Sequence, residues 1–235
     1  MEFTLFGRGH VSAILVLALL VAGIVWAGKR AGRRARDWVG RALAFALIAY
    51  AAAMYLRLAF RGELAWAYSL PLELCHWVLI ACLVSVLTGN RLASEIAYFW
   101  GLGGTLQAVL TPDLLDGFPS WDFIQFFWAH GVVILTVAHL IAARDFRPRP
   151  RSVLRMMLAA NFYLLVAGSL DMIFGWNYGY LRRPPSQPSL LDYLGPWPWY
   201  ILSLELIALC IFILLTLPFR KSRRQDHRID GMQVM

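Results

Sequence analysis

A cysteine and several ionisable side chains lie inside apolar stretches of this chain. An ionisable group is unfavourable in such surroundings, so its presence indicates a catalytic, binding or structural role. Cys75 and His76 follow Glu73 early in one apolar run, and His130 lies within another. A thiolate can attack an ester carbonyl to form a thioester, and an imidazole can take up the thiol proton. On a helix His76 projects about 100° away from Cys75, which makes it a poor base for that thiol. The pattern predicts Cys75 as the nucleophile and favours His130 as the general base, with His76 as the alternative.

Other polar residues could orient that base or contact a substrate. We expect Asp171 or Glu73 to orient the imidazole, as carboxylates do in catalytic triads. We expect Asn177 or Gln107 to donate a hydrogen bond to an oxyanion. The residues predicted to contact substrate are His76, Gln107, Asn177, Tyr178, Arg182, Arg183 and Glu205.

Each of these residues also has a purely structural interpretation. A free cysteine is often a small buried hydrophobe, and a buried histidine often forms a hydrogen bond between two helices. Asp171 and Glu205 could pair with Arg or Asn across a helix bundle, and Gln107 could join two helices. The sequence leaves both interpretations open.

Metal and cofactor chemistry is not expected. Glu73-x-x-His76 has the spacing found in carboxylate di-iron bundles, but those proteins need the motif twice. His130 and His139 are nine residues apart and therefore lie on opposite faces of a helix. Phosphate-loop and H-E-x-x-H motifs are absent, and no lysine lies in an apolar run to hold retinal. We expect no metal and no cofactor.

The composition requires that these residues be positioned by membrane helices. Of the 235 residues 60% are hydrophobic and only 15% are charged, too little charge for a soluble domain, a disordered chain or a coiled coil. A bilayer core needs about 20 helical residues per span. The sequence predicts an all-α, polytopic membrane protein, a seven-transmembrane-helix bundle over residues 1–220, followed by a basic, disordered cytoplasmic tail, 221–235. The predicted spans are 10–28, 39–60, 72–89, 93–111, 122–143, 152–175 and 197–219.

The basic residues predict the orientation of this bundle. With the N-terminus outside, 17 lysines and arginines fall on the inner side and 5 on the outer side. The positive-inside rule then places the N-terminus outside and the C-terminus in the cytoplasm, in the cell membrane. The same rule explains the net charge of +8 better than nucleic-acid binding does.

With this orientation, polar residues of several spans fall in the outer half of the bilayer and predict a polar cavity that opens outward. The loop from Gly179 to Pro196 contains several prolines and could cap the cavity, with Arg182 and Arg183 placed to bind a phosphate headgroup.

Three segments carry a resemblance to a known family. Leu-Pro-Leu-Glu-Leu-Cys-His (70–76), Phe-Trp-Ala-His-Gly (127–131) and Asn-Tyr-Gly-Tyr-Leu (177–181) resemble the YwaF-like family of bacterial seven-span integral membrane proteins, over roughly residues 5–220. That family is distantly similar to an animal TMEM-type lysophospholipid acyltransferase, which is thought to use a cysteine and a histidine inside the membrane. The matching positions here are Cys75 and His130. The resemblance implies acyl transfer between phospholipids through a thioester on Cys75.

Two classes of function remain. The first is a lipid acyltransferase or esterase whose partners are membrane phospholipids. The second is a small-molecule or ion transporter or receptor that uses the same cavity without covalent chemistry, with Glu73, Asp171 and Glu205 binding a cation or carrying protons. An assembly factor without a small ligand is also compatible with the sequence, which does not specify an oligomeric state.

Overall fold

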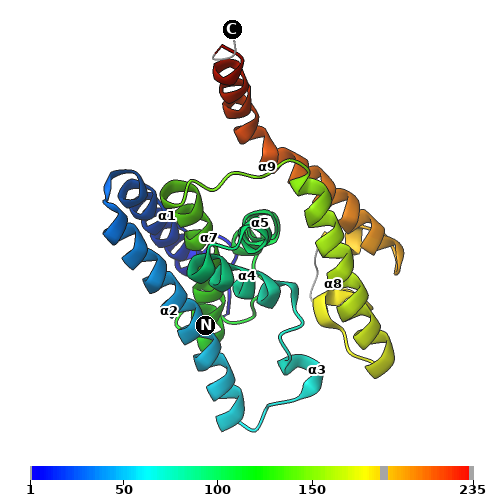
Figure 1. Cartoon of the computed structure of the whole chain (residues 1–235). Coiled ribbons are helices and arrows are strands. Elements are labelled where there is room, and N and C mark those ends of the chain that lie inside the picture. Colours follow the sequence, from blue (N-terminus) through cyan, green and yellow to red (C-terminus); the bar gives the residue numbers. More distant parts are fainter. Residues whose placement is uncertain (1, 186–189, 233–235) are drawn as a thin grey trace.

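The chain folds almost wholly into helices. The computed structural model describes residues 2–185 and 190–232, with side chains of the last helix as far as Phe219. No strand occurs in this part, apart from one isolated bridge between Glu2 and Asp116. The expected all-α class is therefore confirmed. Figure 1 shows the elements: α1 (Arg8–Arg30), α2 (Arg33–Phe60), α3 (Trp66–Ser69), α4 (Leu74–Thr88), α5 (Arg91–Trp100), η1 (Gly101–Thr105), α6 (Leu106–Leu110), α7 (Trp121–Ala143), α8 (Ser152–Phe174), η2 (Tyr178–Tyr180), η3 (Leu190–Tyr193) and α9 (Trp199–Met232).

Five helices in the described residues are long and apolar enough to cross a membrane. They are α1, α2, α7, α8 and the segment Trp199–Phe219 of α9, and they match five of the predicted spans. The predicted third and fourth spans differ. A turn at residues 70–73 delays the start of α4, which has only 15 residues, or about 22 Å. The fourth comprises α5, the π-helical turn η1 and α6 in direct succession. Seven spans and the direction of the chain therefore stay predictions.

Local sequence signals explain where the central helices begin and end. Gly89 adopts a left-handed φ of 68° and ends α4. Asn90 then caps α5, because its side chain accepts a hydrogen bond from the backbone N–H of Ala93 at 3.0 Å. Ser120 caps α7 in the same way, at 3.2 Å from the N–H of Phe123. These caps set the starting points of two of the helices that surround the candidate site.

The core lies where the α4–α5 hairpin packs against α2 and α7. Cys82 and Phe99 are fully buried there. α1 packs along α7, and the two helices touch near one end, where a Cβ on Gly28 would lie 2.8 Å from the Cβ of Ala142. Helices α8 and α9 pack together on the other side of the core (Figure 1).

The outer surface of the helices is apolar, as expected for a protein in lipid. Leu19 on α1, Phe45 on α2, and Leu165 and Ile173 on α8 are each at least 66% exposed. Large apolar side chains spread over a soluble monomer at this density would favour aggregation. Their distribution supports the assignment as a membrane protein.

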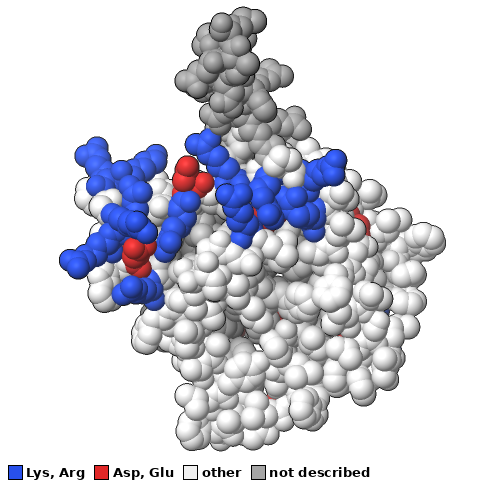
Figure 2. All heavy atoms as spheres, in the orientation of Figure 1, with Lys and Arg blue, Asp and Glu red and all other residues white. Residues whose placement is uncertain are grey.

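Lysines and arginines gather at one end of the helices, called here the basic end: the segments Lys29–Arg41, Asn90–Arg91 and Arg144–Arg155. Figure 2 shows them on one side of the visible face. α9 continues through Pro218 to Met232, across the predicted boundary at residue 220. The side chains of 220–232 and residues 233–235 lie outside the described part, so the predicted tail 221–235 is not tested.

Candidate functional site

Cys75 lies in the first turn of α4, at the end of the molecule opposite the basic end. Its thiol is free and exposed. It lies within electrostatic range of the Tyr50 hydroxyl on α2, of the Tyr163 hydroxyl on α8 and of the Glu73 carboxylate. The amide groups at the start of α4 favour a thiolate, whereas the negative charge of Glu73 opposes it. The thiol therefore needs a base that removes its proton as the new bond forms.

Glu73 and Asp171 hold the loop that follows α8 beside this cysteine. An oxygen of Glu73 accepts a hydrogen bond from the backbone N–H of Gly179 at 2.9 Å, and Asp171 Oδ1 accepts one from the N–H of Tyr178 at 3.0 Å. Asp171 is fully buried, and its Oδ2 has no hydrogen-bond partner. In the described residues neither carboxylate bonds an imidazole, and these two contacts hold the loop in position. A role of either carboxylate in orienting the base stays a prediction.

Tyr178 locks this loop onto the segment before α4. Its side chain is 1% exposed. The hydroxyl donates to the carbonyl of Trp66 at 2.7 Å and accepts from the N–H of Leu70 at 3.0 Å. Burial raises the pKa of Tyr178, which keeps the hydroxyl protonated and able to donate. Tyr178 therefore supports the site through backbone contacts.

Gly179 is in tight contact with Tyr163. Gly179 has a φ of 61°, and a Cβ placed on it would lie 2.2 Å from the Tyr163 hydroxyl oxygen. That hydroxyl is buried and has no hydrogen-bond partner. Tyr163 thus presents an unsatisfied O–H near Cys75, in a place that only glycine at position 179 leaves open.

The two candidate bases differ in their hydrogen bonding. His130 Nδ1 lies 2.8 Å from the carbonyl oxygen of Phe126, and its ring stacks on the Phe126 ring with centroids 4.1 Å apart. Because a carbonyl can only accept, Nδ1 carries the proton and Nε2 keeps a free lone pair. His76 Nδ1 is buried without a partner. The backbone N–H of His76 bonds to the Cys75 thiol, but among the described residues no side-chain interaction joins either imidazole to it.

The remaining predicted substrate contacts in the loop after α8 stabilise the loop itself. Asn177 Oδ1 accepts from the N–H groups of both Arg182 and Arg183, at 3.1 Å each. The Arg182 side chain reaches the carbonyl of Trp176 at 3.3 Å. Both arginines are exposed and could still contact a headgroup. Residues 186–189, in the middle of the predicted cap, lie outside the described part.

Gln107 and Glu205 are engaged elsewhere. The Gln107 amide donates to the Thr111 hydroxyl at 2.7 Å, one turn further along the chain. Glu205 accepts from the Asn161 amide at 3.0 Å and so joins α9 to α8. These contacts favour the structural interpretation of both residues.

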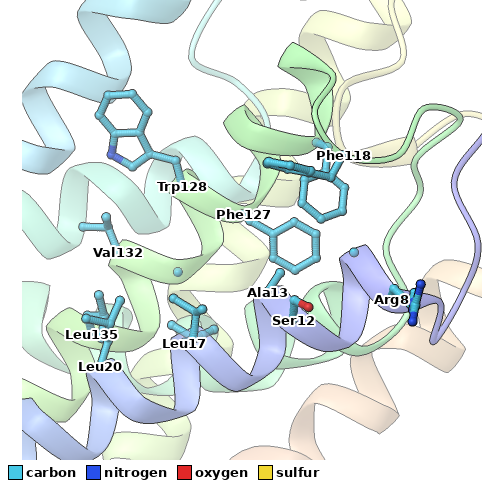
Figure 3. A pocket seen from close by; sticks show the side chains of 14 residues that line it. Arg8, Ser12, Ala13, Leu17, Leu20, Phe118, Phe127, Trp128, Val132 and Leu135 are labelled. Atoms are coloured by element: carbon cyan, nitrogen blue, oxygen red, sulfur yellow. The ribbon is translucent and has the colours of Figure 1, made fainter. Parts of the chain in front are cut away.

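An apolar groove of about 660 Å³ runs between α1 and α7 (Figure 3). Leu17 and Trp128 are among the side chains that line it, and Arg8 lies at one end. Near the opposite end of α1 the helices are in close contact, because Gly28 leaves room for Ala142. Trp128 also packs edge-on against Tyr50, with 6.2 Å between the ring centroids.

Sequence reasoning missed Tyr50, Tyr163 and Gly179. Both tyrosines lie in apolar runs and look like ordinary core residues. Gly179 was visible only as part of the segment Asn-Tyr-Gly-Tyr-Leu, whose close contact with α8 depends on the fold. In the described residues no group of His, Cys, Asp and Glu is arranged to hold a metal ion.

Comparison with known proteins places the chain in a family. The TMEM164 family model matches residues 5–216. This chain belongs to the TMEM164 family. An uncharacterized protein of Treponema pallidum (strain Nichols) is 31% identical to this family member over 172 residues, which are 70% of this chain and 68% of the relative. No solved structure matches the chain. The TMEM part of the predicted resemblance is confirmed and supports a membrane location, while the YwaF-like assignment stays a prediction.

Proposed function

We propose that this protein is a lipid acyltransferase of the cell membrane, multi-pass with its N-terminus outside, that moves an acyl chain between phospholipids through a thioester on Cys75. The observation that carries the proposal is the setting of Cys75. An exposed free thiol in the first turn of α4 lies beside a carboxylate and tyrosine hydroxyls from separate helices. Packing alone does not require such a cluster.

In the proposed first step Cys75 Sγ attacks the ester carbonyl of a donor phospholipid. The thiol proton passes to His130 Nε2, which is unprotonated because Nδ1 donates to the Phe126 carbonyl. The C–O ester bond breaks, the lysophospholipid alkoxide takes the proton from the imidazolium, and an acyl thioester remains. In the second step an acceptor hydroxyl attacks the thioester, and its proton returns through the imidazole to the departing sulfur.

This mechanism requires α4 and α7, which pack against each other, to bring Sγ and Nε2 together when lipid is bound. Catalytic hydrogen bonds often tighten only in the substrate complex. His76 is the alternative base. The two can be separated, because replacing the true base lowers kcat and removes the acidic limb of the pH profile, whereas replacing the other changes neither.

Tyr163 is the best-placed oxyanion donor. Its hydroxyl is buried and unsatisfied, and it lies within electrostatic range of Cys75. The amides of Gln107 and Asn177, by contrast, bond within their own segments. A tetrahedral intermediate on Cys75 would give the Tyr163 hydroxyl its missing acceptor, which stabilises the transition state more than the ground state.

The groove between α1 and α7 suits one acyl chain of the lipid substrate. Its lining is apolar, and Arg8 at its end forms no ion pair in the described residues and can contact a phosphate. The groove reaches Trp128, which contacts Tyr50 beside Cys75. A chain held there would place the lipid backbone near the cysteine.

The decisive experiment incubates the detergent-purified protein with a lysophospholipid and a diacyl phospholipid, and weighs the intact protein and the lipids by mass spectrometry. Wild type should gain one acyl mass and form new diacyl product, and Cys75→Ala should do neither. Cys82→Ala and Cys210→Ala are matched controls, since Cys82 is fully buried in the core and Cys210 is exposed on α9. Acyl transfer that survives in folded Cys75→Ala would refute the mechanism.

One observation favours the second candidate, a transporter or receptor. Asp171 Oδ2 is buried without a partner and could bind a cation or carry a proton. In that case Asp171→Asn would abolish ligand binding or proton-coupled uptake in proteoliposomes, and Cys75→Ala would have no effect.

A further inference from the structure

A second cavity, of about 570 Å³, lies at the basic end, far along the helices from Cys75. Its walls come from the end of α4, the start of α5, the end of α7 and the connection from α7 to α8. Four arginines line it, against two acidic residues: Arg91, Arg144, Arg147 and Arg149 against Glu95 and Asp145. Basic residues that only orient a chain in the membrane need not converge on a cavity.

Most of these arginines are already held in place. Arg144 contacts Asp37 at 3.3 Å and Arg147 contacts Asp145 at 3.5 Å. Arg91 is exposed and forms no ion pair in the described residues. Among the arginines that line the cavity, Arg144, Arg147 and Arg149 are thus in ion pairs, and Arg91 is the one without an ion-pair partner in the described residues.

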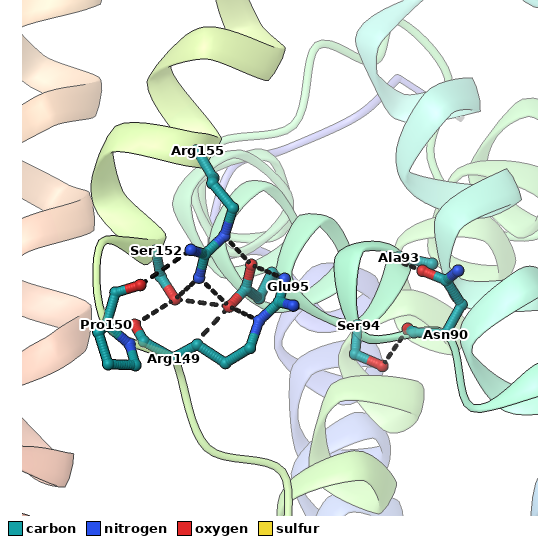
Figure 4. Close-up of polar contacts among 8 residues, drawn as sticks. All are labelled: Asn90, Ala93, Ser94, Glu95, Arg149, Pro150, Ser152 and Arg155. Carbon is teal, nitrogen blue, oxygen red and sulfur yellow. Dashed lines mark hydrogen bonds and ion pairs between the residues drawn. The ribbon is translucent and has the colours of Figure 1, made fainter.

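Glu95 holds in place the wall of the cavity that contains Arg149. It is 1% exposed and accepts hydrogen bonds from both Arg149 and Arg155, as well as from the Ser152 hydroxyl at 2.6 Å (Figure 4). One carboxylate thus holds two guanidinium groups, and a positive charge is left over. Arg149 is positioned by this contact before any ligand arrives, which lowers the entropic cost of binding an anion.

The floor of the cavity is also polar. The hydroxyls of Ser85 and Ser94 are 2.7 Å apart, and both residues are buried. The start of α5 lies beside them and is capped by Asn90, whose backbone carbonyl oxygen accepts from the Ser94 hydroxyl at 2.9 Å. Both serine hydroxyls are thus bonded within the protein, and the guanidinium groups of the wall are the donors that suit a phosphate.

We propose that this cavity binds a phosphate group, carried either by a phospholipid headgroup of the adjoining leaflet or by a soluble phosphate compound. The site is separate from the proposed acyltransferase centre, and the proposal of a phosphate site does not depend on acyltransferase activity.

The test uses the full chain purified in detergent and two probes. Tryptophan fluorescence follows thermal unfolding during titration with inorganic phosphate, with chloride at equal ionic strength as the reference. Native mass spectrometry compares the retention of phosphatidylglycerol with that of phosphatidylcholine. A ligand that binds only the folded state raises the Tm with its concentration. Stabilisation by phosphate supports the soluble source, and preferential retention of phosphatidylglycerol supports the headgroup.

Arg91→Gln should weaken binding of the effective probe at least tenfold, because it removes the uncompensated charge without breaking an ion pair. Arg91→Lys keeps the charge but loses the paired donors, so its affinity for the probe should lie between those of wild type and Arg91→Gln. Arg30→Gln is the matched control: Arg30 is exposed at the basic end but does not line the cavity, and its replacement should change binding less than twofold. The proposal is overturned if neither probe exceeds its reference, or if Arg91→Gln and Arg30→Gln weaken binding equally.

Discussion

Replacing Gly179 with alanine tests the contact that brings the loop after α8 against the candidate site. The added Cβ would lie 2.2 Å from the hydroxyl oxygen and 3.3 Å from Cζ of Tyr163, at a backbone φ of 61°. A left-handed conformation costs a non-glycine residue about 1–2 kcal/mol, and overpacking a filled site costs about 1–3 kcal/mol. We expect a loss of about 3 kcal/mol, or about 6–12 °C in Tm for a chain of this size.

The two contributions can be separated with matched variants. Gly62 has a similar φ of 66°, but a Cβ there meets nothing within 4 Å, so Gly62→Ala should show the backbone cost alone. Combining Gly179→Ala with Tyr163→Phe removes the overlapping oxygen and should restore the steric part of the loss.

The assay is thermal unfolding of the purified protein, followed by tryptophan fluorescence. Acyl transfer is measured in parallel, and we expect it to fall with Gly179→Ala because the loop moves away from Cys75. The reasoning is refuted if Gly179→Ala unfolds at the wild-type temperature, or if Tyr163→Phe fails to improve it.

Three further predictions concern other contacts. Glu95→Gln should lower the free energy of unfolding by about 3 kcal/mol in denaturant titration, because the half-buried Arg149 and Arg155 lose the negative charge that compensates them, whereas Glu63→Gln at an exposed pair should change it by under about 0.5 kcal/mol. Gly28→Ala should lower the Tm, since its Cβ would meet Ala142 at 2.8 Å, while Gly23→Ala, with open space around it, should not. Leu17→Trp should fill the α1–α7 groove and raise the KM for lipid with little change in Tm; an unchanged KM would exclude the groove as the acyl-chain site.

The polar residues of the candidate site could be found from the sequence, but their partners could not. Glu73, Cys75 and Asp171 attract notice because ionisable groups are expensive in apolar spans. Whether Asp171 meets an imidazole or the N–H of Tyr178 depends on how the chain turns after Gly175, and the spacing of residues does not encode that turn. The unpaired Tyr163 hydroxyl was hidden for the same reason, because its surroundings come from distant segments.

Some helix lengths follow from the sequence alone, and others depend on tertiary contacts. α1, α2, α7, α8 and α9 follow from long apolar runs, because backbone groups in lipid must be satisfied within each helix. The short α4 was not expected from its apolar run. The turn at residues 70–73 keeps Glu73 outside the helix, where its carboxylate reaches Gly179. The contact between Glu73 and Gly179 joins residues far apart in the sequence, and a hydropathy profile carries no information about such contacts.

The sequence by itself determined that this is a helical membrane protein. The composition and the lengths of the apolar runs are local properties, and the thickness of the bilayer core sets the run length that a spanning helix needs. It also singled out Cys75 and His130 by residue type. Only the tertiary structure decided that Glu73 and Asp171 hold a loop, that α1 and α7 separate into a groove, and that arginines converge on a cavity around Glu95. These features depend on side chains far apart in the chain meeting at specific angles, and many packings of the same helices would satisfy the same apolar pattern.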